Sequence, residues 1–174
     1  TLASAGMYQS KTFLDAEAGN NRMQGVVVGA GSHGYDQVIS LNIVHGRYFS
    51  PSESAAGRPV AVIGHEVANQ LFGRSEVVGQ TLKVRGIRME VIGVLAQEGE
   101  SIVSTGLDEF MLVPSAFAPR IYDARADDNA QIAIKAQPGV DLAALEDELV
   151  QQLRAVRRVR PGREEDFSVN RMEM

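Results

Sequence analysis

Short apolar runs, separated by glycines, prolines and polar stretches, follow one another along most of the chain. Runs rich in β-branched residues predict buried strands, and the alternation of apolar and polar residues from Gln131 to Ala136 predicts a half-buried one. Two of the runs flank a turn with a central glycine, which indicates a hairpin. The predicted strands span residues 24–29, 59–64, 81–84, 89–95, 109–114, 131–136 and 166–169, with a weaker one at 12–14.

Two segments have the apolar spacing of helices. Glu66–Phe72 is the shorter, and Gly73 follows it at the position of a C-terminal cap. The longer begins at Asp141, a natural N-cap, and ends at Val156. Its apolar side chains form one stripe, which predicts a face packed on the core and a cost of ~2–5 kcal/mol for an alanine at its centre. The stripe consists of Leu142, Leu145, Leu149, Leu153 and Val156.

Two polar stretches, 50–59 and 123–129, divide the chain. A short helix or helical turn beginning at Ser50 and Pro51 fits the first of them. The strand–helix–strand order of the last third resembles half of a ferredoxin-like unit. The sequence therefore predicts an α+β fold. A discontinuous ferredoxin-like subdomain, formed by residues 1–54 and 126–174, holds an inserted small α/β subdomain, residues 55–125.

Composition narrows the functional classes. The chain has 174 residues, a formal net charge of −5 and no cysteine. The missing basic excess argues against a nucleic-acid partner. Without cysteine there is no disulfide framework, thiolate metal site or cysteine nucleophile. No apolar run approaches the ~20 residues of a membrane span. Since the chain begins at Thr1, we expect it to be an excised piece of a longer protein.

One motif suggests a dinucleotide site. Residues 29–34 match G-x-G-x-x-G after a predicted strand, and Glu53 lies about 20 residues further on, where such a site places an acid. The fingerprint also needs a regular helix behind the third glycine and a second parallel strand near the acid. Gly46 and Pro51 interrupt the chain first. We therefore interpret the glycines as a tight turn.

Other chemistry is sparse. His33, His45 and His65 lack metal-type spacing, no pair of acids stands out, and no serine lies in a nucleophile elbow. The sequence therefore predicts no catalytic, cofactor or metal site. A basic cluster near the C-terminus fits either an anionic lipid head group or acidic partner, or a solvated helix end whose cations offset the helix dipole. Neighbouring acids at 164–166 favour the second. The cluster consists of Arg154, Arg157, Arg158, Arg160 and Arg163.

Four stretches in order resemble the periplasmic core domain of MacB-like ABC transporter permeases, in the FtsX-like permease superfamily. They are GRYFS at 46–50, the block from VAVIG at 60–64 to VGQ at 78–80, VIGVL at 91–95, and LR at 153–154 followed by DFSV at 166–169. The residues that carry the resemblance are Gly46, Arg47, Phe49, Gly64, Phe72, Gly73, Gly79, Gly93, Asp166 and Phe167.

The resemblance implies a non-catalytic domain outside the cytoplasmic membrane of a bacterium. It implies a dimeric permease driven by a cytoplasmic ABC ATPase, fused or separate, with a periplasmic adaptor and an outer-membrane duct as further partners. The alternatives are a lipoprotein-release or cell-division type of permease domain, and a stand-alone nucleotide-binding α/β enzyme. The polar segment of the insert is the expected partner-binding loop, with Glu98, Gly99, Glu100, Ser101 and Ser104 as its contact residues.

Overall fold

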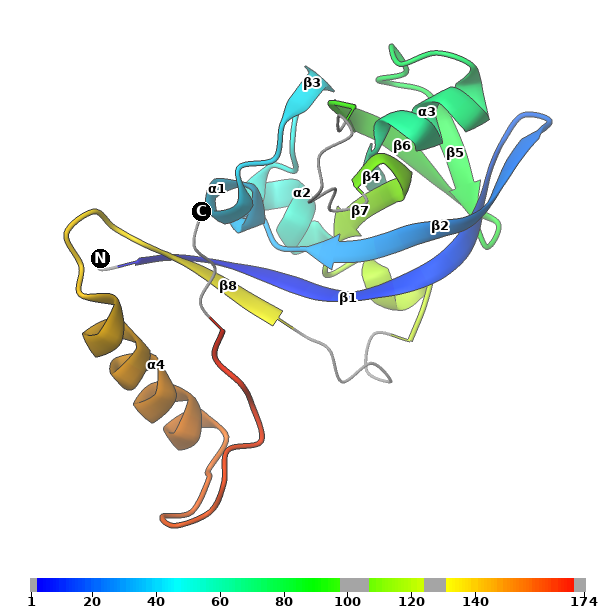
Figure 1. The fold of residues 1–174 in the computed structure, drawn as a ribbon. Helices are drawn as coiled ribbons and strands as arrows, with labels where there is room; N and C mark the ends of the chain where they lie inside the picture. Colours follow the sequence, from blue (N-terminus) through cyan, green and yellow to red (C-terminus); the bar gives the residue numbers. More distant parts are fainter. Residues whose placement is uncertain (1–2, 98–106, 124–130, 171–174) are drawn as a thin grey trace. The chain divides into compact units, whose positions relative to one another are not determined.

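The computed structural model describes residues 3–97, 107–123 and 131–170 (Figure 1). The strands are β1 (Ala3–Ala18), β2 (Asn21–Gly31), β3 (Ile43–Gly46), β4 (Val60–Ile63), β5 (Thr81–Val84), β6 (Ile87–Leu95), β7 (Phe110–Pro114) and β8 (Gln131–Ala136). The helices are α1 (Tyr35–Ile39), α2 (Pro51–Ala56), α3 (His65–Phe72) and α4 (Leu142–Val156), with 3-10 turns η1 (Leu107–Glu109) and η2 (Ala118–Arg120).

The strands form one sheet that closes on itself. Its order is β2-β7-β4-β6-β5-β1-β8, and β1 also pairs with β2. Strands β1, β2, β7, β4, β6 and β5 therefore make a ring, while β3 pairs with β6. β2 pairs with β7 and β4 with β6 in parallel, whereas the β5–β6 hairpin is antiparallel as predicted. The predicted mixture of strands and short helices is confirmed.

Strand β1 is much longer than the predicted strand at 12–14. In its second half the buried side chains alternate, at Leu14, Ala16 and Ala18. Two of the three are alanines, so the hydrophobic signal in the sequence is faint. Main-chain pairing on both edges stabilises this strand in place of large buried side chains. Leu14 lies opposite Val26 of β2, and Ala16 lies opposite Val84 of β5. β1 thereby closes the ring.

Both faces of the central strands are covered. Along β4, Ala61 and Ile63 join a core cluster that includes Leu71 of α3, whereas Val60 and Val62 join a second cluster with Phe49. Successive side chains of a strand point to opposite faces, so a strand buried on both faces has a continuous apolar sequence. This explains why the apolar run at 59–64 predicted its strand correctly.

The chain divides into two compact units. One is Ala5–Ile134 and the other comprises residues 1–4 and 135–174. The predicted division into 1–54 plus 126–174 and an insert 55–125 is a different partition and stays a prediction. In the described part of the chain, no helix is long and apolar enough to cross a membrane.

Helix α4 begins after Asp141, whose carboxylate accepts a hydrogen bond from the amide of Ala143 at 2.9 Å. Its own unit leaves all of its residues at least partly exposed, and the packing of its apolar stripe on the core stays a prediction. Its periodicity shows that one face is apolar and does not show what covers that face. The prediction of a last strand at 166–169 is wrong, because this segment has no regular secondary structure. Arg157 donates to the Asp166 carboxylate at its start.

Candidate functional site

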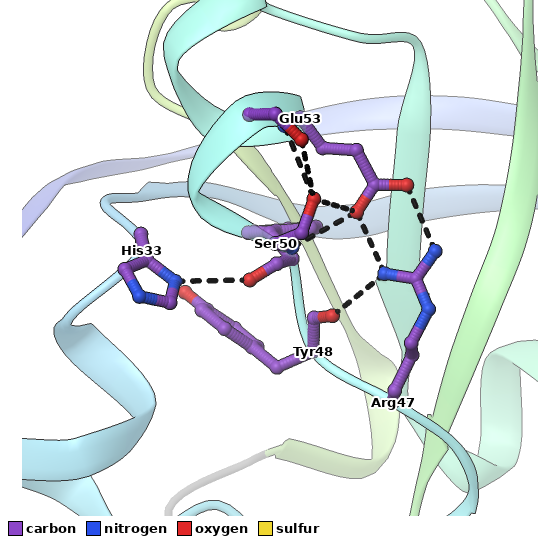
Figure 2. A network of polar contacts seen from close by, with 7 residues as sticks. His33, Arg47, Tyr48, Ser50 and Glu53 are labelled. Carbon is purple, nitrogen blue, oxygen red and sulfur yellow. Dashed lines mark hydrogen bonds and ion pairs between the residues drawn. The ribbon is translucent and has the colours of Figure 1, made fainter.

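The segment Gly46–Ser50 connects β3 to α2 and lies at the centre of a polar network (Figure 2). Gly46 has φ +77°, and a Cβ there would lie 2.1 Å from the Ile92 carbonyl oxygen. Only glycine combines that backbone conformation with so close an approach. The amide of Arg47 donates to the same carbonyl at 2.9 Å. Phe49 is 2% exposed. The segment is therefore fixed to β6 on one side and to the core on the other.

Arg47 and Glu53 form a two-point ion pair. Nη1 of Arg47 donates to Oε2 of Glu53 at 2.6 Å, and Nη2 donates to Oε1 at 2.9 Å. Nη1 also donates to the carbonyl of Tyr48 at 3.1 Å. The guanidinium matches a carboxylate bidentately, which fixes orientation as well as charge. The pair therefore links the connecting segment to the first turn of α2.

Ser50 and Glu53 form a capping box at the start of α2. The Ser50 hydroxyl accepts from the amide of Glu53 at 3.2 Å, and the Glu53 carboxylate accepts from the amide of Ser50 at 2.9 Å and from its hydroxyl at 2.8 Å. Each side chain satisfies a main-chain donor that the helix leaves unpaired. Ser-x-x-Glu is visible in the sequence, so this signal could have predicted the role of Glu53.

The donors around Glu53 determine its protonation state. Hydrogen bonding from Arg47, followed by bonds from Ser50, outweighs burial and lowers the pKa of Glu53 to about 2. Its carboxylate is ionised near neutral pH, with both oxygens accepting from protein donors. Such a group is a poor general base, because proton uptake would break the ion pair.

Tyr48 and His33 tie the network to the loop after β2. The Tyr48 hydroxyl donates to the carbonyl of Ser32 at 3.0 Å, and burial raises its pKa well above the usual value for tyrosine. Nδ1 of His33 lies 3.1 Å from the carbonyl oxygen of Phe49. A carbonyl can only accept, so His33 is the donor. Neither role is visible in local sequence patterns, since the partners lie 16 residues apart.

The G-x-G-x-x-G motif serves internal packing. The interpretation of its glycines as a tight turn is wrong for the first two, because Gly29 and Gly31 lie in β2 and only the end of the motif turns. A Cβ on Gly31 would come within 2.6 Å of the Tyr48 hydroxyl. The following helix, α1, has 5 residues. The acid of the fingerprint, Glu53, is bound to Arg47. These contacts give the motif residues a role in holding Tyr48 rather than a pyrophosphate.

Further motif glycines lie where backbones meet. A Cβ on Gly64 would lie 2.1 Å from the carbonyl oxygen of Leu107, and one on Gly93 would lie 2.5 Å from that of Arg47. Gly73 ends α3 in the left-handed conformation, as predicted, and the amide of Gly79 (φ +85°) donates to Val91. Phe72 packs partly buried against the core.

The C-terminal motif residues lie in the other unit. Nε and Nη2 of Arg157 donate to the two carboxylate oxygens of Asp166 at 2.8 and 2.7 Å, and Phe167 is half-buried. Arg154 pairs with Glu165. The predicted neutralisation of the basic cluster by neighbouring acids is confirmed at these two arginines. The contacts fold the segment after α4 back toward the helix.

The expected partner-binding loop, with Glu98, Gly99, Glu100, Ser101 and Ser104, lies outside the described residues. The segments on either side of it line a pocket of about 400 Å³ together with the end of α1. Its lining residues are Ile39, Ser40, Leu41, Asn42, Leu95, Ala96, Gln97 and Leu107. Across the described ranges, no group of three or more His, Cys, Asp or Glu side chains could hold a metal ion.

Comparison with protein families gives a match over residues 2–152, to the MacB-like periplasmic core domain. Among curated proteins, the pyoverdine export ATP-binding/permease protein PvdT of Pseudomonas entomophila is 33% identical over 115 residues. That alignment covers 65% of this chain and 18% of the relative, so the chain spans less than a fifth of that protein.

Two solved structures share the fold. The extracellular domain of the ABC-type transporter YknZ from Gram-positive bacteria superposes with a TM-score of 0.71 at 19% identity, covering 89% of this chain and 76% of that one. The periplasmic region of MacB from Actinobacillus actinomycetemcomitans gives 0.71 at 15% identity, covering 87% and 66%. At these identities the likeness concerns the fold alone.

Proposed function

The chain belongs to the MacB-like periplasmic core domain family, and from that premise we propose that it is the extracytoplasmic domain of an ABC exporter permease. In this role it couples ATP hydrolysis in the cytoplasm to export through a change of shape. The observation that carries the proposal is the family match over residues 2–152, which includes every motif of the sequence up to the last helix.

The ATPase and the membrane helices of such an exporter belong to regions of the relatives that this chain does not cover. The named relative is an ATP-binding/permease protein of which the chain covers 18%. We therefore assign the ATPase and the membrane helices to other parts of the parent protein or complex, and the domain to the periplasmic side of the cytoplasmic membrane. The relatives are named as export proteins, which favours an exporter over a lipoprotein-release or cell-division permease.

The contacts of the acidic and glycine motifs support a non-catalytic role. The carboxylate of Glu53 is occupied by Arg47 and Ser50, and Gly31 accommodates Tyr48. An ionised carboxylate whose oxygens already accept hydrogen bonds from the protein stabilises a turn and is a poor general base. We infer that the network passes movement between β6 and α2 as a stiff connection.

The finer assignments form part of the same proposal. The ferredoxin-like subdomain comprises 1–54 and 126–174, and the insert 55–125 presents the loop around residues 98–106 to a periplasmic adaptor connected to an outer-membrane duct. A second permease subunit completes the transporter. The pocket between the end of α1 and the segments flanking this loop supports placing a contact surface there.

The test separates coupling from hydrolysis in the full-length permease. Residues 98–106 are replaced with a Gly-Ser linker of equal length, and export and ATPase activity are measured in the same membranes. We expect export to fall at least tenfold while ATP hydrolysis persists. Export at the wild-type rate would remove the loop from the mechanism.

The matched control inserts Gly-Ser residues at Arg85–Gly86, the exposed turn between β5 and β6. This variant should export normally. Thermal unfolding of both variant domains checks that the sheet remains intact. If the two variants lose export equally, with folded domains, a specific docking role for the loop is wrong.

A further inference from the structure

The pocket beside the end of α1, of about 400 Å³, is lined entirely by residues of the unit Ala5–Ile134. Its walls come from residues 39–42 at the end of α1, residues 95–97 at the end of β6, and Leu107 at the start of η1. The amide of Ala96 donates to the carbonyl of Asn42 at 2.8 Å, which joins two of the walls. The volume is within the range of roughly 300–1,000 Å³ that is usual for small-molecule sites. The shape of the pocket is therefore set within this unit alone.

Leucine and isoleucine side chains connect the pocket to the core. Leu95 is 3% exposed and belongs to the second core cluster, the one that contains Phe49. Leu41 and Leu107 pack against that cluster but stay half-buried, as does Ile39. The exposed parts of these side chains leave water when an apolar group enters the pocket, which favours binding of an apolar molecule.

The polar part of the lining is uncharged. It consists of the exposed side chains of Ser40, Asn42 and Gln97, and within the described ranges none of these side chains makes a hydrogen bond to the protein. A side-chain amide offers both donors and an acceptor, so Asn42 and Gln97 can bind a neutral polar group. Among the described residues that line the pocket, none carries a charge that could compensate an ionised ligand. Because an unpaired charge is costly to remove from water, the lining selects against ions.

We propose that this pocket binds a small, neutral molecule with an aliphatic or aromatic body and a hydroxyl, amide or ester group at its edge. The apolar body lies against the leucines of the lining, and the polar group meets Asn42 and Gln97. The proposal rests on the pocket alone and goes beyond the role in export. It is independent of whether residues 98–106 contact an adaptor.

Two dyes with the same aromatic rings test the preference for a neutral ligand. Phenylnaphthylamine is uncharged, whereas anilinonaphthalene sulfonate carries a sulfonate, and the fluorescence of both increases when they leave water. We expect the neutral dye to bind the 174-residue chain saturably at one site, at least tenfold more tightly than the sulfonate dye. Equal affinities, or no saturable binding of the neutral dye, would overturn the proposal.

A substitution in the lining tests where the dye binds. Asn42→Phe places an aromatic ring at the edge of the pocket and should weaken binding of the neutral dye at least fivefold, because the ring competes for the same space. The matched control is Gln70→Phe, at an exposed position of α3, which should bind the dye as the natural chain does. Circular dichroism confirms that both variants are folded. If Asn42→Phe binds the dye as tightly as the natural chain, the dye lies elsewhere and the proposal is wrong.

A change of charge gives a second test that does not depend on packing. Gln97→Lys puts a cation at the edge of the pocket, so the sulfonate dye should bind at least threefold more tightly, with an affinity that falls as salt is added. Gln70→Lys is the control and should leave both dye affinities unchanged. A sulfonate affinity indifferent to Gln97→Lys would contradict the proposal. Binding of the neutral dye only after residues 98–106 are replaced with a Gly-Ser linker would show that the chain itself occupies the pocket, which would also overturn it.

Discussion

The carboxylate of Glu53 accepts hydrogen bonds from both Arg47 and Ser50 in the segment that connects β3 to α2. These donors stabilise its ionised form and lower its pKa to about 2, from 4.5. A carboxyl group whose pKa is depressed by folding adds stability above its unfolded pKa. That contribution disappears as the pH falls through the folded pKa. Glu53 therefore stabilises the domain at neutral pH and stops doing so in acid.

Glu53→Gln tests this directly. We expect the free energy of unfolding of the natural chain to fall between about pH 4.5 and pH 2, and to fall less steeply in the variant, which has no charge to lose. Urea unfolding at a series of pH values measures the difference. Glu66→Gln is the control, since the Glu66 carboxylate accepts from a neutral donor, the side-chain amide of Gln70, at 2.9 Å. This variant should keep the slope of the natural chain. Equal slopes for Glu53→Gln and the natural chain would contradict the argument.

Gly64 gives a second residue-scale prediction. A Cβ there would lie 2.1 Å from the carbonyl oxygen of Leu107 and 2.2 Å from that of Asp108, and main-chain atoms cannot easily move aside. Gly64→Ala should therefore cost about 3 kcal/mol or more. Gly73→Ala meets no atom within 4 Å and should cost only the left-handed strain, about 1 kcal/mol. Chemical denaturation of both variants compares them, and equal losses would refute the close approach.

At the scale of elements, α3 and α4 share an amphipathic pattern but differ in burial. α3 buries Val67, Ala68 and Leu71, whereas none of the residues of α4 is buried. The sequence shows an apolar face in both helices. It does not show whether a sheet lies in front of that face, because this depends on the path of the whole chain.

Alanine substitutions should reveal the difference. Leu71→Ala, at a side chain 1% exposed, should cost ~2–5 kcal/mol because it opens a cavity. Leu149→Ala, at a half-buried side chain, should cost less than Leu71→Ala. Thermal or urea unfolding gives both values. A loss at Leu149 as large as that at Leu71 would mean that α4 is packed in solution.

Local patterns predicted most elements correctly. Strands β4 to β8 and helices α3 and α4 follow from continuous apolar runs, alternation and helical spacing, which depend on neighbouring residues alone. β1 was underestimated because Ala16 and Ala18 carry its inward face. The motif residues Gly46, Arg47 and Gly93 were recognised, but their contacts with one another were not. Those contacts join residues far apart in the chain.

At the scale of the whole molecule, the closure of the sheet into a ring could not be predicted from local sequence patterns. It depends on Ala16 lying opposite Val84 and Glu17 opposite Lys83, with the β1–β2 hairpin on the other edge of the same strand. Pairing over such separations is set by the complete fold. A closed sheet also leaves its member strands with few unpaired edges, which protects them from pairing with other chains.

The division into two units has a mechanical meaning. Both ends of the chain belong to one unit, and the other, Ala5–Ile134, is a single excursion that leaves and returns within β1 and β8, neighbours in the sheet. A pulling force applied to the two ends therefore loads the unit with α4 first and reaches the ring only through these two strands. We therefore expect the ring of strands to move as one rigid body under such a force, while the unit with α4 carries the tension.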